Sequence, residues 1–233
     1  GRPDSALNTF VENMNKEDGS GQWPSCGADD NQAHIYMKIV PVVCRYAGRP
    51  DLMDRVDTCI RVHQNNHQAV AFAKASTRIL EAILLGANDL KEVLETCEAN
   101  LLLQASQDEH EGVAEKEEMK LVLKAFADAK KYGVGTVEES SSSEQQEYAD
   151  LDSVLLHYSH QLMKDKPESP FYNLAARSCA LPGSFVGPLY LFHKAASGRY
   201  GDDKSTWYEQ ALRENILASG DTCSRAVFIG AVF

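Results

Sequence analysis

Residues 69–85 read AVAFAKASTRILEAILL, which is the most apolar helical stretch of the chain. Apolar and small side chains recur there every three or four residues, the period that places them on one face of an α-helix. They are Val70, Ala73, Thr77, Leu80, Ala82 and Leu84. Because small side chains let neighbouring helices approach closely, we expect this helix to lie at the centre of the fold.

Helical spacing continues on both sides of this stretch. The turn-forming sequence GAND at 86–89 ends the central helix and caps the next one. A mixed pattern covers 30–46, where Pro41 kinks or restarts a helix. We expect further helices at 4–16, 52–60, 90–105, 119–133, 148–163, 184–196, 206–218 and 222–233. Since no alternating strand pattern and no internal repeat occurs, the sequence predicts an all-α protein.

The composition is that of a globular protein. The chain has 233 residues, of which 43% are hydrophobic and 24% charged, and a formal net charge of −11. We assign residues 1–233 to a single domain with a mobile loop near 136–147, where serines cluster. The negative charge repels phosphate backbones, so we expect no nucleic-acid partner. No apolar stretch approaches the roughly 18 residues of a membrane span, so we expect no membrane association.

The number and spacing of the cysteines indicate the redox state of the thiols and the cellular compartment. Six cysteines are scattered without a CxxC pair, which favours reduced thiols and a cytoplasmic location.

The chain starts at Gly1 and ends with the apolar run AVFIGAVF at 226–233, whose side chains and last carbonyls need partners. We interpret the chain as a piece of a longer protein that lacks an N-terminal part; alternatively, the run packs into the core.

Two acidic motifs are candidate ligand-binding sites, and the first lies near the N-terminus. Asp29 and Asp30 follow a Gly-Ala pair in a loop that leads into a helix. Adjacent acids at a helix N-terminus are favourable for the helix dipole alone, so capping explains them as well as a ligand role does. In the ligand role their oxygens would bind a hard cation or ribose hydroxyls.

The second motif is SGDTCSR at 219–225, just before the last apolar helix. Taken alone, this pattern is most typical of a helix N-cap at Asp221. However, Asp221 and Ser224 lie one helical turn apart, so their oxygens can converge on one cation or phosphate. Arg225 can then pair with an anionic group through two hydrogen bonds.

Several segments resemble the ADP-ribosylglycohydrolase family. The segments WYEQALR (207–213) and SGDTCS (219–224) are similar to the EEAL-type helix and the GGD-x-D-T signature that close the family pattern. Before them, LPGSFVGPLYLF (181–192) resembles the penultimate motif. Upstream, IVPV (39–42) and RVHQNNHQA (61–69) resemble the family's iaPl and tHxdpeA segments. The resemblance covers most of the chain and implies an all-α, orthogonal multi-helix bundle.

Three segments resemble more narrowly the branch with jellyfish J-type lens crystallins and fish selenoprotein J: QWP (22–24), GADDNQAH (27–34) and GDTCSRA (220–226). The family resemblance implies that two magnesium ions bind ADP-ribose, or an ADP-ribosylated substrate, in an acidic cleft where water attacks the anomeric carbon. Asp221 and Ser224 map onto magnesium ligands. Asp29, Asp30 and Arg225 are expected to contact ADP-ribose.

Two departures from the family pattern bear on function. Nothing in residues 1–25 matches the family's first acidic cluster, and Cys223 stands where the closing signature has a second aspartate. A thiol is a poor ligand for a hard cation, so we expect a weakened site for a single magnesium ion. Three functions remain open: a magnesium-dependent ADP-ribosyl hydrolase, a non-catalytic crystallin-like structural protein, and a pseudoenzyme that binds ADP-ribose.

Overall fold

The computed structural model describes residues 4–107, 113–134 and 148–233. Within these ranges the chain forms α-helices, two short 3-10 helices and two isolated β-bridges, but no β-strand. The prediction of an all-α fold is therefore confirmed. The loop predicted near 136–147 lies outside the described residues. None of the helices described is long and apolar enough to cross a membrane.

The helices follow the predicted order along the chain. They are α1 (Ser5–Met14), α2 (Ile35–Tyr46), α3 (Leu52–His63), α4 (His67–Leu84), α5 (Leu90–Gln107), α6 (Val113–Val134), α7 (Leu151–Leu162), η1 (Ala175–Arg177), α8 (Gly183–Ala196), η2 (Lys204–Thr206), α9 (Trp207–Leu217) and α10 (Thr222–Val232). The mixed pattern at 30–46 resolves into a short irregular segment, with an isolated β-bridge at Gln32 and a turn at 33–34, followed by α2, which contains Pro41.

Helix α4 lies at the centre, as its sequence predicts. It packs against α2, α3, α5, α6 and α10, and most of its small and apolar residues are buried, including Val70, Ala73, Thr77 and Leu80. Leu84, which the periodicity also placed on this face, is 53% exposed because it lies at the C-terminal end of the helix. Asn66 caps its N-terminus, since the Asn66 Oδ1 atom accepts a hydrogen bond of 2.9 Å from the backbone of Ala69. Burial of one helix on several sides removes most of its apolar surface from water, which is the main stabilising contribution of such a core.

Helix α8 is the second central element, and every residue from Gly183 to Ala195 is buried. Pro188 lies inside this helix and has no N–H to donate to the carbonyl of Ser184 one turn earlier. That carbonyl instead accepts a hydrogen bond of 3.2 Å from the Tyr36 hydroxyl of α2. A side chain from another helix thus satisfies the group that proline leaves unpaired.

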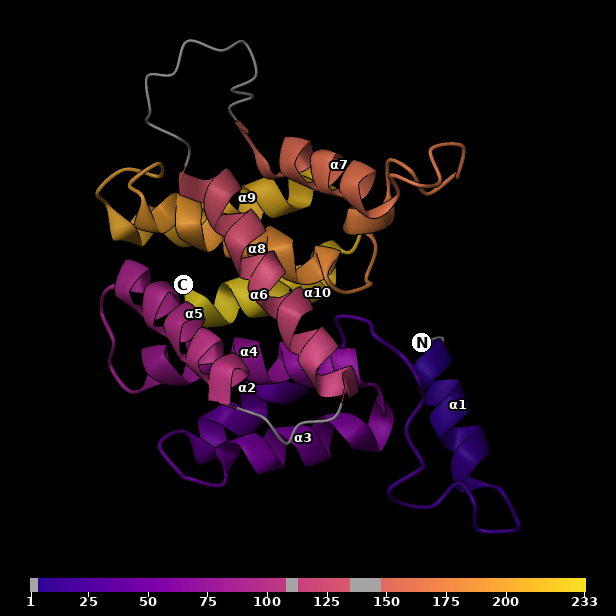
Figure 1. Cartoon of the computed structure of the whole chain (residues 1–233). Coiled ribbons are helices and arrows are strands. Elements are labelled where there is room, and N and C mark those ends of the chain that lie inside the picture. The colour runs from indigo at the N-terminus through magenta and orange to yellow at the C-terminus, as the bar shows by residue number, and fades with distance from the viewer. Residues whose placement is uncertain (1–3, 108–112, 135–147) are drawn as a thin grey trace.

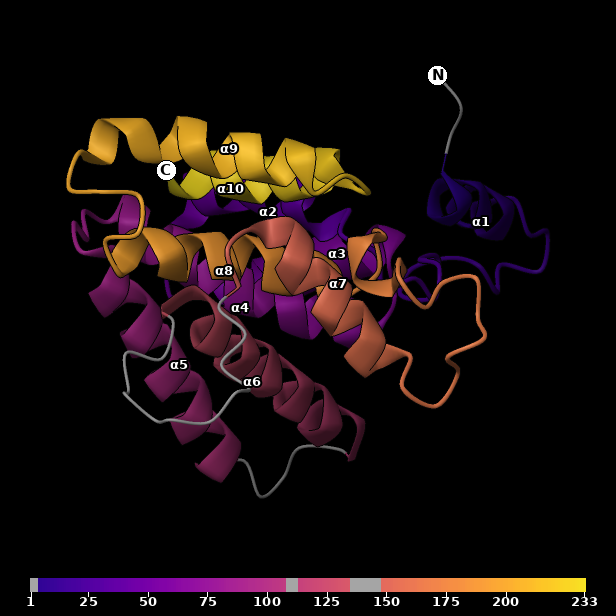
Figure 2. The ribbon, with the colours of Figure 1, turned by 90° about the horizontal axis from the view of Figure 1, so that it is seen from above.

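The remaining helices cover α4 and α8 from two sides. Figure 2 shows α9 and α10 on one side and α5 and α6 on the other, while α6 runs across α8 in Figure 1. The crossing is close: a Cβ atom on Gly133 of α6 would lie 2.5 Å from the Cβ atom of His193. Helix α1 lies apart from the bundle in both views.

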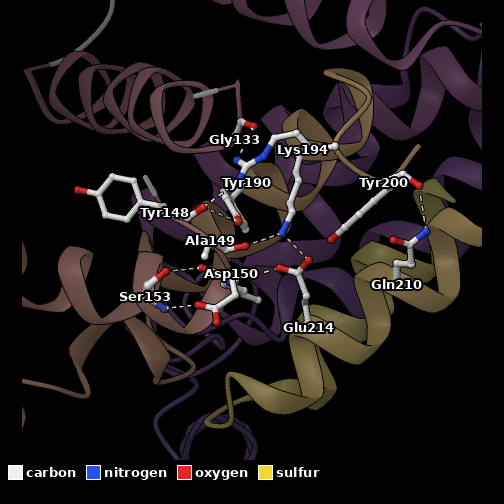
Figure 3. A network of polar contacts seen from close by, with 12 residues as sticks. Gly133, Tyr148, Ala149, Asp150, Ser153, Tyr190, Lys194, Tyr200, Gln210 and Glu214 are labelled. Carbon is white, nitrogen blue, oxygen red and sulfur yellow. Dashed lines mark hydrogen bonds and ion pairs between the residues drawn. The ribbon is translucent and has the colours of Figure 1, made fainter. Parts of the chain in front are cut away.

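A polar network joins α7, α8 and α9 (Figure 3). The Lys194 ammonium group of α8 donates to the Ala149 carbonyl at 2.9 Å and to the Glu214 carboxylate of α9 at 2.7 Å. The other carboxylate oxygen of Glu214 accepts from the Leu151 backbone at the start of α7. The apolar run at 226–233 forms most of α10 and packs into the core through Phe228, Ile229 and Val232.

Candidate functional site

The predicted motif at 219–225 forms a tight loop between α9 and α10. Ser219 and Gly220 both adopt left-handed backbone conformations, with φ of 56° and 72°. A Cβ atom at position 220 would lie 2.1 Å from the carbonyl oxygen of Arg177, so only glycine fits there. The backbone N–H of Asp221 donates to the same carbonyl at 2.9 Å. The loop is therefore pressed against the end of the short helix η1.

Asp221 caps α10, as the capping interpretation predicts. Its Oδ1 atom accepts a hydrogen bond of 3.3 Å from the backbone of Ser224. Its Oδ2 atom is buried and has no hydrogen-bond partner. A buried, unpaired acceptor is costly, which makes this oxygen a candidate for contact with a cation or with a donor on a ligand.

The other residues of the motif differ in exposure. Ser224 is buried in the first turn of α10, whereas the thiol-bearing Cys223 is exposed beside it. The structure thus brings Asp221 and Ser224 into one helical turn, as predicted, and leaves Cys223 facing solvent.

Arg225 is fully buried, and the protein itself provides its partners. The Nε atom donates to Asn215 Oδ1 of α9 at 2.7 Å, and the two terminal nitrogens donate to the carbonyls of Ser219 and Arg177. Burial lowers the pKa of the Arg225 guanidinium group, and the nearby Asp221 carboxylate opposes that shift. The predicted contact between Arg225 and ADP-ribose stays a prediction, and in this structure the side chain holds the Asp221 loop.

The first acidic motif, Asp29 and Asp30, does not cap a helix. The residue at the N-cap of α2 is His34, and it makes no side-chain capping bond. Instead, Asp29 accepts a hydrogen bond of 2.7 Å from Asn66, and Asp30 accepts one of 3.3 Å from Gln64. Both partners belong to the connection between α3 and α4.

The side chain of Gln64 connects the segments of this region, a role that the sequence analysis did not predict. The side chain is fully buried, and its amide nitrogen also donates to the backbone carbonyls of Asp30 and Gln32. Its oxygen accepts from Lys38, whose Nζ atom also lies 2.8 Å from the His63 ring. Burial lowers the pKa of the Lys38 ammonium group to about 8.

Backbone pairing brings the two acidic motifs into one region. The segment after Asp30 pairs with 179–181, because Ala33 donates to the Cys179 carbonyl at 2.8 Å and Leu181 donates to the Asn31 carbonyl at 3.0 Å. Burial raises the pKa of the Cys179 thiol, and the carboxylates of Asp221 and Asp30 raise it further. Asp30 and Asp221 are far apart in sequence, but both carboxylates lie close enough to Cys179 to raise the pKa of its thiol.

The residues present fit a magnesium ion only in part. Across 4–107, 113–134 and 148–233, no group of three or more His, Cys, Asp or Glu side chains is arranged to hold a metal ion. The Asp221 Oδ2 atom is, however, a buried oxygen without a partner. Because magnesium requires about six oxygen ligands, this one carboxylate oxygen is not by itself a metal site, and magnesium binding stays a prediction.

Comparison with family models matches residues 1–233 to ADP-ribosylglycohydrolase. The chain therefore belongs to the ADP-ribosylglycohydrolase family. Comparisons with curated proteins and with solved structures gave no match. The narrower resemblance to the branch with lens crystallins stays a prediction, since the family model represents the family as a whole.

The sequence did not indicate three residues that build the site: Asn215, Arg177 and Gln64. Asn215 occupies an ordinary position in α9, and Arg177 contributes its backbone carbonyl, which no sequence pattern reports. Only the placement of glutamine, a polar residue, between two helices at 64 could have suggested a buried amide that bridges loops.

Proposed function

We propose that this chain binds ADP-ribosyl groups at the loop 219–221, with one magnesium ion held by Asp221. The observation that carries the proposal is the buried, unpartnered Oδ2 atom of Asp221 in a member of the ADP-ribosylglycohydrolase family. A bound cation satisfies this oxygen and removes the cost of its burial. Asp30, whose charge acts on the same Cys179 thiol, is the candidate for a second carboxylate contact.

Binding is favoured over hydrolysis as the activity of this chain. When bound, a magnesium ion supplies positive charge to the diphosphate of ADP-ribose and completes its coordination with water. Cys223, which is exposed at the position of the signature's second aspartate, offers no hard oxygen for a further ion or for a reacting water. We further infer a reducing compartment such as the cytoplasm, because all six cysteines are free thiols.

The test is calorimetric titration of ADP-ribose into the protein with and without magnesium. We expect binding that depends on magnesium. Asp221→Asn keeps the capping oxygen and the side-chain shape but removes the charge, so it should weaken this binding roughly ten- to hundredfold. The matched control is Asp150→Asn, because Asp150 caps α7 through a similar bond of 2.9 Å to the backbone of Ser153.

Three results would contradict the proposal in different ways. Equal affinities of the wild type and Asp221→Asn for ADP-ribose would show that Asp221 does not hold the magnesium ion or the ligand. No binding by the folded wild type in either condition would favour the non-catalytic structural role. If chromatography detects free ADP-ribose after the wild type is incubated with an ADP-ribosylated peptide, the chain is a hydrolase.

A further inference from the structure

The burial of Arg225 requires an explanation beyond helix packing. Among the residues that the structure describes, it is the only charged side chain with 0% exposure. Placing a guanidinium group in the interior costs several kcal/mol unless the protein provides partners. The partners that it has here are all parts of one small region around the loop 219–222.

These hydrogen bonds hold the loop from both sides. Arg225 donates to the Ser219 carbonyl at the start of the loop and, at 3.4 Å, to the Arg177 carbonyl against which the loop is pressed. Asn215 accepts from Arg225 and itself donates to the Thr222 carbonyl at 2.9 Å, on the far side of the loop. The two side chains therefore fix the backbone before and after Asp221.

The strained backbone of the loop makes such support necessary. Ser219, which is not glycine, has a positive φ, an unfavourable conformation for a residue with a side chain that persists only where surrounding contacts impose it. Without the Arg225 hydrogen bond to its carbonyl, Ser219 is free to return to an ordinary backbone conformation. That change would rotate the peptide that leads into Asp221.

We propose that Arg225, together with Asn215, is a positioning residue that fixes the Asp221 carboxylate for ligand binding and does not itself touch the ligand. This inference rests on the proposed function for its ligand, but its structural part concerns only the loop. It predicts that loss of Arg225 moves Asp221, whereas direct recognition by Arg225 would require the guanidinium group to leave its three internal acceptors.

The first test measures amide hydrogen exchange by NMR in the absence of ligand. Arg225→Met should accelerate exchange of the Asp221 amide at least tenfold relative to the amides of α4. Without Arg225 the loop is held less firmly, so the hydrogen bond from the Asp221 amide to the Arg177 carbonyl opens more often. Asn215→Ala, which removes one acceptor of Arg225 and one donor to the loop, should produce the same effect more weakly and covers the case in which Arg225→Met fails to fold.

The matched control is Arg199→Met. Arg199 also donates to backbone carbonyls, those of Tyr132, Gly133 and Tyr148, but at the opposite end of α8. This variant should lower the melting temperature and leave exchange at Asp221 within about twofold of the wild type, relative to α4. Unchanged exchange at Asp221 in folded Arg225→Met or Asn215→Ala would overturn the inference.

A second test uses ADP-ribose with magnesium and the wild-type protein. The Arg225 Nε–H signal should stay protected from exchange when the ligand binds, and loss of that protection would show direct contact and overturn the inference. Affinity should fall at least tenfold in Arg225→Met and stay within twofold in Arg199→Met. If the wild type binds no ADP-ribose, the proposed function fails, while the exchange test still decides whether Arg225 fixes the loop.

Discussion

The resemblance to the closing signature of the family predicts that Cys223 stands where the signature has a second aspartate. The residue is exposed in the first turn of α10, one position from Ser224 and two from Asp221. Cys223→Asp would add a hard oxygen ligand and a negative charge at a helix N-terminus, which also suits the helix dipole. We expect magnesium affinity, measured by calorimetry, to increase about tenfold.

The control for this substitution is Cys223→Asn, because asparagine has the same shape as aspartate but no charge. It should leave magnesium affinity within about twofold of the wild type. If Cys223→Asp also gives no gain, Cys223 does not occupy a metal-ligand position, and its correspondence with the family's second aspartate is wrong.

His193 makes the stability of the protein sensitive to acid. Its Nε2 atom is buried without a partner, and burial lowers the pKa of the imidazole to about 4, with the Lys130 charge as a smaller cause. The unfolded chain takes up this proton near pH 6.5, so it binds more protons than the folded chain between pH 6.5 and pH 4. Stability is therefore lost as the pH falls through that range.

The expected contribution of His193 is about 2 kcal/mol of unfolding free energy between pH 7 and pH 4.5. His193→Leu, which cannot be protonated, should show a correspondingly smaller loss in urea denaturation at the two pH values. An identical pH dependence in the variant and the wild type would show that His193 is protonated without cost in the folded state.

At the residue scale, the sequence predicted the site in part. It identified Asp221 because a carboxylate before a helix of small apolar residues is a local pattern, and the structure keeps that pattern as an N-cap. It could not predict the partners of Arg225, since they depend on how α9, α10 and η1 meet in space. The contact of Asp30 with the buried amide of Gln64 could not be predicted either, because it also depends on how separate segments meet in space.

At the scale of elements, the ion pair between Lys194 and Glu214 joins α8 to α9 (Figure 3). The side chains are only 9% and 17% exposed, so removing one partner leaves the other charge poorly solvated. Lys194→Met should cost about 3 kcal/mol of unfolding free energy. Adding Glu214→Gln to this variant should recover part of the loss, because the amide oxygen still accepts from the Leu151 backbone while the unpaired charge is gone.

Denaturation of the two single variants and the double variant measures this coupling as a double-mutant cycle. Strict additivity of the three free-energy changes would show that Lys194 and Glu214 do not act as a pair. A further loss in the double variant would mean that the Glu214 charge is stabilised by groups other than Lys194.

Helices were predicted where periodicity was long and uninterrupted, as in α4, and less well where proline intervened. Pro41 lies inside α2, although the sequence allowed a restart there. Pro188 is tolerated because Tyr36, far away in sequence, bonds to the carbonyl that proline leaves free. The short helix η1 was missed, since a three-residue turn has no periodicity to read.

At the scale of the whole molecule, segments from three parts of the chain form the candidate site. The segment after Asp30 pairs with 179–181, and the loop 219–221 packs on the carbonyl of Arg177 immediately before it. The site thus depends on contacts between residues more than 140 positions apart, such as the hydrogen bond from Cys179 to Gln32. Substitutions that disturb the 178–181 segment should therefore affect both acidic motifs together.

Helix α1 is coupled to the rest of the molecule more weakly than the other helices are. It lies apart from the bundle, its apolar residues Leu7, Val11 and Met14 are between 38% and 47% exposed, and Ala6 is its one buried residue. Its contacts with the rest of the molecule include those from its N-cap Asp4 to His34 and His63 and that of the Phe10 ring with the His63 ring. Few buried apolar contacts predict a low free energy of local opening.

We therefore expect the amides of α1 to exchange at least a hundredfold faster than those of α4 and α8 in native-state hydrogen exchange. Low denaturant concentrations should hardly change their rates, because local opening exposes little surface, whereas exchange in α4 and α8 should accelerate with denaturant as global unfolding does. Protection of α1 equal to that of α4 would show that it unfolds together with the bundle. In that case the polar contacts of Asp4 would stabilise the helix far more than exposed ion pairs usually do.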